Sequence, residues 1–167
     1  TRHRAPSPTG EPWRVAHLTD LHLGWGTPRH LLDQAVALTH AMRPDLVVLT
    51  GDYLNRNLVH LDELGQLVAR LPRPCIATLG NHDHWSDAAA IARTLEQRGA
   101  AVLRNAALTV AHGGRRLTVV GVDDAFTRHD DVDAALALAG DPARTLALCH
   151  FPNTADALAA RGARLAL

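Results

Sequence analysis

Short apolar runs alternate with amphipathic stretches along most of the chain. Four of the runs, over residues 13–19, 45–50, 75–79 and 145–149, are short and bounded by polar or turn-forming residues, which is typical of buried strands. The stretches between them repeat apolar residues three and four positions apart, which predicts helices with one buried face. These faces comprise Leu31, Ala35, Leu38 and Met42 in one stretch, and Leu61, Leu64, Val68 and Leu71 in the next.

Capping residues give the limits of several helices. Thr27 is an N-cap residue and Pro28 suits the first helical position, so a helix is predicted over residues 27–42. Ser86 predicts the start of a third helix and Gly99 its end. Two further helices are predicted at about 131–139 and 154–161, and residues 163–167 predict the beginning of a strand.

Residues 107–122 depart from the strand–helix alternation. Two β-type runs flank Gly113 and Gly114, a pair that favours the tight turn of a hairpin. Alternation of strands and helices, followed by a hairpin, predicts an α/β fold with one mixed sheet or two sheets, covered by helices.

The composition fits a single domain. The chain has 167 residues, of which 47% are hydrophobic and 20% are charged, so it can bury a substantial core. Its formal net charge is +0, so nothing indicates nucleic acid as a partner. Residues 1–12 contain three prolines and predict a flexible, extended arm, which leaves residues 13–167 as the core. Cys75 and Cys149 lie in apolar runs, which predicts buried thiols rather than a disulfide framework.

Localisation is not decided by the sequence. No apolar run is long enough to span a bilayer. The chain begins at Thr1 rather than Met, so membrane association through a segment before Thr1 stays open. The choice between a cytoplasmic protein and an exported or anchored bacterial protein therefore stays open, as does the oligomeric state.

Polar side chains of metal-binding type follow four of the predicted strands. They are Asp20 and His22, then Asp52, then Asn81, His82 and Asp83, and finally His150. In open α/β sheets, ligands gather outside the carboxyl ends of the strands, so strands of one polarity would bring these side chains to one edge. Gly51 and Gly80 allow tight turns and close approach of the backbone there.

The chemistry of this set indicates divalent metal ions. Mixed carboxylate, imidazole and amide ligands suit manganese, iron or zinc better than calcium. One aspartate can bridge two ions about 3.5–4 Å apart, and such a pair can clamp both oxygens of a phosphoryl displacement. Residues i and i+2 of a strand point the same way, so Asp20 and His22 would reach one ion if the strand stays extended through them.

Each element also has an ordinary structural interpretation when taken alone. Gly51–Asp52 is a common turn pair, residues 81–83 suit a helix cap, and a single His150 is more often a core histidine. Chance rarely places ligand-type residues directly after four separate strands, so the set as a whole favours one site. His84 stays open between lining the pocket and a structural role. The other histidines are predicted to be structural or solvated: His3, His17, His30, His40, His60, His112 and His129.

Four sequence blocks carry a family resemblance. TDLHLG (19–24), LTGDYL (49–54), LGNHDHW (79–85) and LCHFPN (148–153), in this order, resemble the calcineurin-like metallophosphoesterases. GVDDAF (121–126) is similar to a bacterial phosphodiesterase-like branch. The resemblance covers almost all of the chain after residue 12 and implies an αββα sandwich of two mixed β-sheets flanked by helices, with the site at one edge. It indicates little about the substrate.

The resemblance also implies residue roles. Asp20 and His22 would bind the first of two divalent metal ions, Asp52 would bridge both, and Asn81 and His150 would bind the second. His82 would be the catalytic histidine, with Asp83 orienting and charging it; no substrate-binding residue is indicated. The implied function is hydrolysis of a phosphate ester, a diester or a monoester, by a dinuclear metal centre with a bridging hydroxide.

Two alternatives to that function stay open. One is a non-catalytic metal-binding scaffold. The other is a membrane-associated lipid-linked pyrophosphatase or lipid phosphoesterase, for which Trp13, Trp25 and Trp85 would form an apolar rim.

The family pattern has one segment that this chain lacks. After the His150 block it continues to a Gly-His-x-His segment, which supplies one ligand to each metal and does not occur here. The chain ends at Leu167 on an apolar run of strand type, and an unpaired apolar edge is a liability. Either the chain lacks the C-terminal part of the core, which its apolar end favours, or the protein has lost both ligands. In both cases each metal is one histidine short, which makes an inactive fragment a further alternative.

Overall fold

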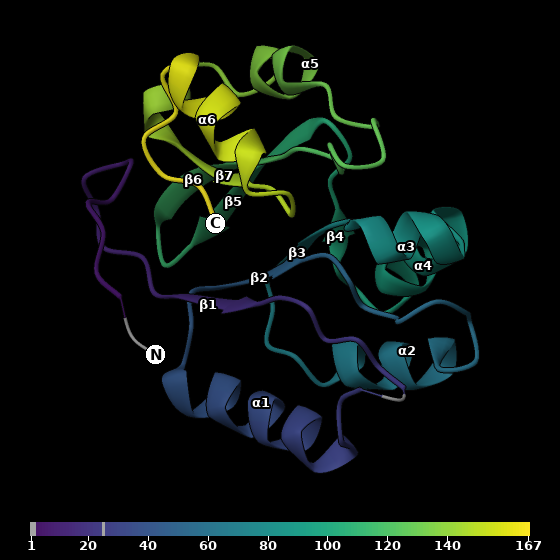
Figure 1. The fold of residues 1–167 in the computed structure, drawn as a ribbon. Coiled ribbons are helices and arrows are strands. Elements are labelled where there is room, and N and C mark those ends of the chain that lie inside the picture. The colour runs from purple at the N-terminus through teal and green to yellow at the C-terminus, as the bar shows by residue number, and fades with distance from the viewer. Residues whose placement is uncertain (1–2, 25) are drawn as a thin grey trace.

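Two β-sheets pack face to face between two layers of helices in the computed structural model, which describes residues 3–24 and 26–167 (Figure 1). The first sheet has the order β1–β2–β3–β4, and its four strands are all parallel. They are β1 (Val15–Leu18), β2 (Leu46–Thr50), β3 (Cys75–Thr78) and β4 (Ala101–Val102).

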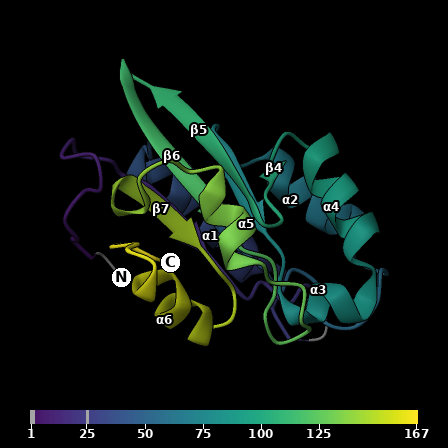
Figure 2. The ribbon, with the colours of Figure 1, turned by 90° about the horizontal axis from the view of Figure 1, so that it is seen from above.

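The second sheet is mixed. It has the order β5–β6–β7, with β5 (Ala106–His112) antiparallel to β6 (Arg115–Gly121) and β6 parallel to β7 (Thr145–Leu148). Figure 2 shows the long β5–β6 hairpin, whose tight turn at Gly113 and Gly114 pairs His112 with Arg115 as predicted. The prediction of two sheets flanked by helices is confirmed, with the mixed pairing confined to the second sheet.

Alternation along β2 explains how one strand serves two interfaces. All five of its residues are buried, because both faces of the first sheet are covered. Leu46 and Val48 pack between the sheets, in the same cluster as Leu146 of β7. Val47 and Leu49 point the other way, into the cluster formed with the helices.

Helices cover both outer faces of the sandwich (Figure 1). The first sheet is covered by α1 (Arg29–Met42), α2 (Leu61–Ala69) and α4 (Ala88–Gln97), which contribute buried side chains to its outer cluster. The second sheet is covered by α5 (Val132–Ala137) and α6 (Asn153–Ala160), close to the predicted limits of both helices. A 3₁₀ turn, Pro142–Arg144, precedes β7.

The buried face of α1 differs from the predicted one. Leu32, Val36 and Thr39 are buried, whereas Leu31 and Leu38 are 46% and 58% exposed. This leucine-rich helix offers two stripes with helical spacing, and the stripe one residue further along is the one that packs. The helix begins at Arg29 after Pro28, and Thr27 provides no cap.

The predicted third helix is α4, and a short helix that the sequence did not predict precedes it. This short helix, α3 (Asn81–Ser86), is separated from α4 by Asp87, whose backbone is extended (φ −164°, ψ 91°). Asp87, not Ser86, caps α4, because its side chain accepts a hydrogen bond from the backbone N–H of Ala90. Gly99, with φ +86°, follows the end of α4 as predicted.

The C-terminal residues pair with the second sheet. The N–H of Leu167 donates to the carbonyl of Ala147, and the N–H of Cys149 donates to the carbonyl of Leu167. Ala166 therefore forms an isolated parallel bridge with Ala147 of β7, at the place where the sequence predicts that a strand begins. Cys75 and Cys149 are buried free thiols, also as predicted. Across the residues that the structure describes, no helix combines the length and apolarity that a bilayer crossing requires.

Candidate metal centre

The carboxyl ends of β1, β2, β3 and β7 bring six predicted site residues to one edge of the sandwich. Their ligand-type atoms form two groups, within each of which all atoms lie within 4.8 Å of one another. The first group is His22, Asp52 and His82, and the second is Asp20, Asp52 and His150. Asn81 joins the second group, because its Oδ1 lies 3.1 Å from His150 Nε2. The prediction that these side chains gather at one edge is confirmed.

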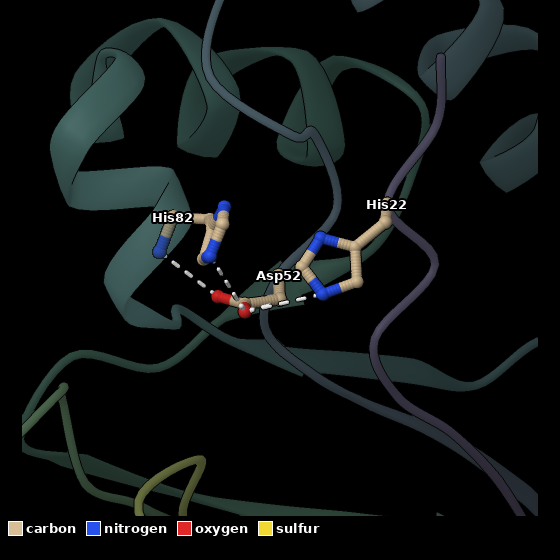
Figure 3. Close-up of side chains that lie close together, drawn as sticks. All are labelled: His22, Asp52 and His82. Carbon is tan, nitrogen blue, oxygen red and sulfur yellow. Dashed lines mark hydrogen bonds and ion pairs between the residues drawn. The ribbon is translucent and has the colours of Figure 1, made fainter. Parts of the chain in front are cut away.

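Asp52 lies at the centre of both groups. Its Oδ2 is 3.5 Å from His22 Nε2 and 4.0 Å from His82 Nε2, and Figure 3 shows the carboxylate between the two rings. Its other oxygen, Oδ1, is 3.4 Å from His150 Nε2 and accepts a hydrogen bond from the backbone N–H of His82. One buried carboxylate thus presents each oxygen to a different set of imidazoles, which is the arrangement that a bridging ligand requires.

Asp52 and His150 shift each other's pKa. Burial disfavours charge on Asp52, but hydrogen bonds from His150 and from the His82 N–H bring its pKa below the ordinary value. Burial likewise opposes charge on His150, yet hydrogen bonds to Asp52 and to the Thr50 carbonyl raise its pKa to about 9. The Asp52 carboxylate thus stabilises a positive charge beside it, which a bound metal ion would supply in place of the His150 proton.

The backbone that carries the acidic ligands is left-handed. Asp20, His22 and Asp52 have φ values of 54°, 40° and 56°. β1 ends at Leu18, so the prediction that an extended strand aligns Asp20 with His22 is wrong. The two side chains still converge, at 3.7 Å, because the N–H of His22 donates to the carbonyl of Asp52 and fixes one loop against the other. Non-glycine residues in this region cost about 1–3 kcal/mol each and cluster at functional sites.

Two glycines let these loops touch backbone to backbone. A Cβ at Gly51, whose φ is +81°, would lie 2.6 Å from Gly80 Cα. A Cβ at Gly80 would collide with the Asp52 carboxylate and lie 2.7 Å from the Asp52 nitrogen. Neither contact is sterically acceptable, so the position of Asp52 depends on glycine at both sites.

Asp83 does not orient His82, which corrects the role assigned to it from the sequence. Its fully buried carboxylate accepts three backbone N–H hydrogen bonds, from Asp52 at 2.8 Å, Tyr53 at 3.0 Å and Gly80 at 2.9 Å. Burial raises the pKa of Asp83 to about 6 in spite of these bonds. Asp83 therefore holds the loop that presents Asp52, from a position behind the site.

The histidine rings are instead held by backbone carbonyls. His82 Nδ1 lies against the carbonyl oxygen of Asn55, and His150 Nδ1 lies 2.8 Å from that of Thr50. An Nδ1–H donated to a carbonyl leaves Nε2 as the free donor atom of the neutral ring, which is the usual state of a histidine ligand. The sequence gives no signal for Asn55 or Thr50, because the backbone rather than the side chain makes these contacts.

The residues present fit a pair of borderline divalent ions. Two carboxylates, an amide oxygen and imidazole nitrogens converge, and no cysteine thiolate competes among them. An open cleft of about 350 Å³ adjoins the site and is lined in part by Asp20 and His150. Substrate-sized molecules therefore have access to the second group of ligands.

His84 faces away from the site. Its Nε2 is 2.8 Å from Asp123 Oδ1, its ring stacks on His129 at 3.9 Å, and its side chain is only 5% exposed. Arg104 Nε donates to the other oxygen of Asp123, at 2.7 Å. His84 therefore has a structural role rather than lining the pocket: its buried pairing with Asp123 fixes α3 to the segment after β6.

Two of the three tryptophans considered for an apolar rim lie in the described residues, and they occupy different places. Trp85 lies beside the site, with its ring 4.9 Å from that of His82. Trp13 packs at the cluster between the two sheets, where the Arg115 guanidinium lies 5.1 Å from its ring. Trp25 lies outside the described residues.

Residues 14–165 match the family of calcineurin-like phosphoesterases. A metallophosphoesterase of Aquifex aeolicus is 30% identical over 119 residues, which cover 70% of this chain and 44% of that protein. The phosphodiesterase YaeI of Escherichia coli is 31% identical over 119 residues, covering 68% of this chain and 44% of YaeI. The UDP-2,3-diacylglucosamine pyrophosphatase LpxG of Chlamydia trachomatis is 36% identical over 74 residues, covering 42% and 22% respectively. The chain thus spans less than half the length of these relatives.

Proposed function

Because the chain belongs to the calcineurin-like phosphoesterase family, we propose that it hydrolyses a phosphate ester at a centre of two divalent metal ions. The observation that carries the proposal is the position of Asp52, whose two oxygens face separate groups of ligands. A structural aspartate in a turn would have no reason to meet three imidazoles at 3.4–4.0 Å.

The assignment of ligands follows the family resemblance: Asp20, His22 and Asp52 would hold one ion, and Asp52, Asn81 and His150 the other. Asp20 lies 3.7 Å from His22 but also belongs to the group of Asp52 and His150, so it is within reach of either ion. Ions held there supply Lewis-acid activation of water and neutralise charge on the phosphoryl oxygens. Asp83 supports the arrangement by holding the N–H groups of the Asp52 loop.

His82 is proposed as the general acid. Its Nδ1 lies against the Asn55 carbonyl and is held there as a donor, so Nε2 is the ring atom left to pass a proton to the leaving oxygen. Its Nε2 points toward Asp52, as a proton donor to a phosphate at the centre must. His82 also belongs to one of the two ligand groups, so its role must be separated from metal binding by experiment.

Metal content and turnover, measured on the same preparations, test the proposal. Asp52→Asn is expected to lose bound manganese, iron or zinc and the hydrolysis of bis(p-nitrophenyl) phosphate together. His82→Ala should retain the metals but lose about a hundredfold in turnover. His30→Ala, an exposed histidine of α1, is the matched control and should change neither quantity.

The outcomes separate the proposal from its alternatives. Loss of metal in His82→Ala would make His82 a ligand rather than a general acid. Bound metal in the native chain without hydrolysis of any monoester or diester would favour the non-catalytic scaffold. Hydrolysis confined to a nucleoside-diphosphate-linked lipid would favour the pyrophosphatase, which the similarity to LpxG supports.

A further inference from the structure

Three aromatic rings form a continuous row that starts at the candidate metal centre. The ring of Trp85 lies 4.9 Å from that of His82, Phe126 lies 5.8 Å from Trp85, and Phe151 lies 5.8 Å from Phe126. We call Trp85, Phe126 and Phe151 the aromatic row. Trp85 is 50% exposed and Phe126 is 56% exposed, so two large rings are left in solvent beside the site.

Each ring is placed by a segment that also supplies a site residue or a buried anchor. Trp85 is three positions after His82 in α3, so both side chains lie on one face of that helix. Phe151 directly follows the ligand His150. Phe126 lies in the turn after β6, which Asp124 closes by accepting hydrogen bonds from the N–H and hydroxyl of Thr127 at 2.8 and 2.7 Å.

The position of His82 between the centre and the aromatic row relates the row to a bound phosphate. His82 Nε2 lies 4.0 Å from Asp52 Oδ2 at the centre, and the Trp85 ring lies 4.9 Å from the ring of the same histidine. The aromatic row therefore begins one ring away from the place where a phosphate would bind. A group esterified to that phosphate and extending past His82 would meet Trp85 first.

We propose that the aromatic row binds a planar aromatic group carried by the substrate's phosphate, either a nucleobase or an aryl alcohol. This inference rests on the proposed phosphoesterase function. Rings in contact edge to face, with interplanar angles of 80° and 61°, leave rigid π-surfaces that a further ring can pack against. Such contacts add stabilisation beyond area burial that an aliphatic chain does not gain.

Binding of phosphonates tests the inference without turnover, because their C–P bond is not an ester. The probes are ethylphosphonate, benzylphosphonate and phosphonoethyladenine, titrated by calorimetry into the manganese-loaded full chain. Both aromatic probes are expected to bind about three- to tenfold more tightly than ethylphosphonate. A larger gain for the adenine probe than for the benzyl probe identifies a nucleotide substrate, and the reverse identifies an aryl ester.

Variants separate ring contact from simple apolar area. The preference is the ratio of the affinities for an aromatic probe and for ethylphosphonate. Trp85→Ala and Phe126→Ala should bring this ratio close to one. Leu38→Ala removes a side chain of α1 that is exposed to a similar extent, and it should leave the ratio unchanged. Phe126→Leu keeps an apolar side chain without the ring and should lose most of the preference. Equal binding of all three phosphonates to the native chain, or a preference that survives Phe126→Leu, would overturn the inference.

The same preparations distinguish this inference from the activity on which it rests. Hydrolysis of bis(p-nitrophenyl) phosphate reports the proposed function, and the phosphonate preference reports the aromatic row. Turnover without any aromatic preference would reject the row as a binding site and leave the phosphoesterase standing. An aromatic preference without turnover would support the row and reject the hydrolytic activity.

Discussion

Replacing Asp83 with asparagine should separate its support of the Asp52 loop from any direct part in catalysis. Asp83 Oδ2 accepts from the N–H groups of Asp52 and Gly80, and Oδ1 accepts from that of Tyr53. Asparagine has one side-chain oxygen, so it can keep the first two bonds only by turning its NH₂ group toward the Tyr53 N–H. That N–H then lies buried against another donor.

The loss of stability in Asp83→Asn comes from the buried Tyr53 N–H, which no longer has an acceptor. Leaving such a group without a partner costs about 1–3 kcal/mol, so Asp83→Asn should lower the free energy of unfolding by that amount. The loop it releases carries the ligand shared by both groups, and loss of such outer contacts typically weakens metal binding about 10–100-fold. Both effects are expected together, because one displaced loop causes both.

The assay compares Asp83→Asn with Asp87→Asn in the same short segment. Asp87 is the N-cap of α4, and asparagine caps a helix about as well as aspartate, so this control should change neither quantity. Urea denaturation of the metal-free protein gives the stability, and manganese titration gives the affinity. If Asp83→Asn matched Asp87→Asn in both measurements, the account of how the Asp52 loop is held would be refuted.

Four further substitutions test other parts of the structure. Gly80→Ala should abolish manganese binding, measured by titration, because the added Cβ collides with the shared carboxylate, and a folded variant with normal affinity would contradict this. Asp123→Asn should destabilise the chain by about 1.5–3 kcal/mol in urea at neutral pH, since it weakens charged hydrogen bonds including that with His84. Burial alone would raise the pKa of Asp123, but these hydrogen bonds outweigh it and lower the pKa. The difference in unfolding free energy between Asp123→Asn and the native chain should therefore shrink as the pH falls through that lowered pKa. A difference that stays constant down to acid pH would exclude the pairing. Leu32→Ala should cost about 2–5 kcal/mol and Leu38→Ala close to nothing, and the reverse order would restore the helix face predicted from sequence.

The positions of the ligands were predictable from the sequence because they depend on topology alone. Parallel strands end at a common edge, so residues that directly follow the strands must meet there wherever their side chains point. The backbone conformation of the loops that carry these residues was not predictable from the sequence. Asp20 and His22 follow β1 in left-handed backbone, a choice imposed by hydrogen bonds to residues 51 and 52 some thirty positions away.

The predictions for Asp83 and for the buried face of α1 were wrong for the same reason: both depend on contacts with distant parts of the chain. The family resemblance implied that Asp83 orients His82, but neighbours on a helix point in directions about 100° apart. Its true partners, the N–H groups of Asp52 and Tyr53, belong to another loop and carry no sequence signal. On α1, the stripe of Leu31 and Leu38 and the stripe of Leu32, Val36 and Thr39 both have helical spacing, and packing against the rest of the chain selects the second.

The short helix α3 connects these observations, because each of its polar residues serves a different part of the molecule. His82 faces the centre and the aromatic row, Asp83 holds the Asp52 loop, and His84 is fixed to Asp123 of the second sheet. His150, also on the second sheet, contacts Asn81 and Asp52 across the same boundary. The spacing between the two ligand groups is therefore set by how the sheets pack, and α3 is fixed to both of them.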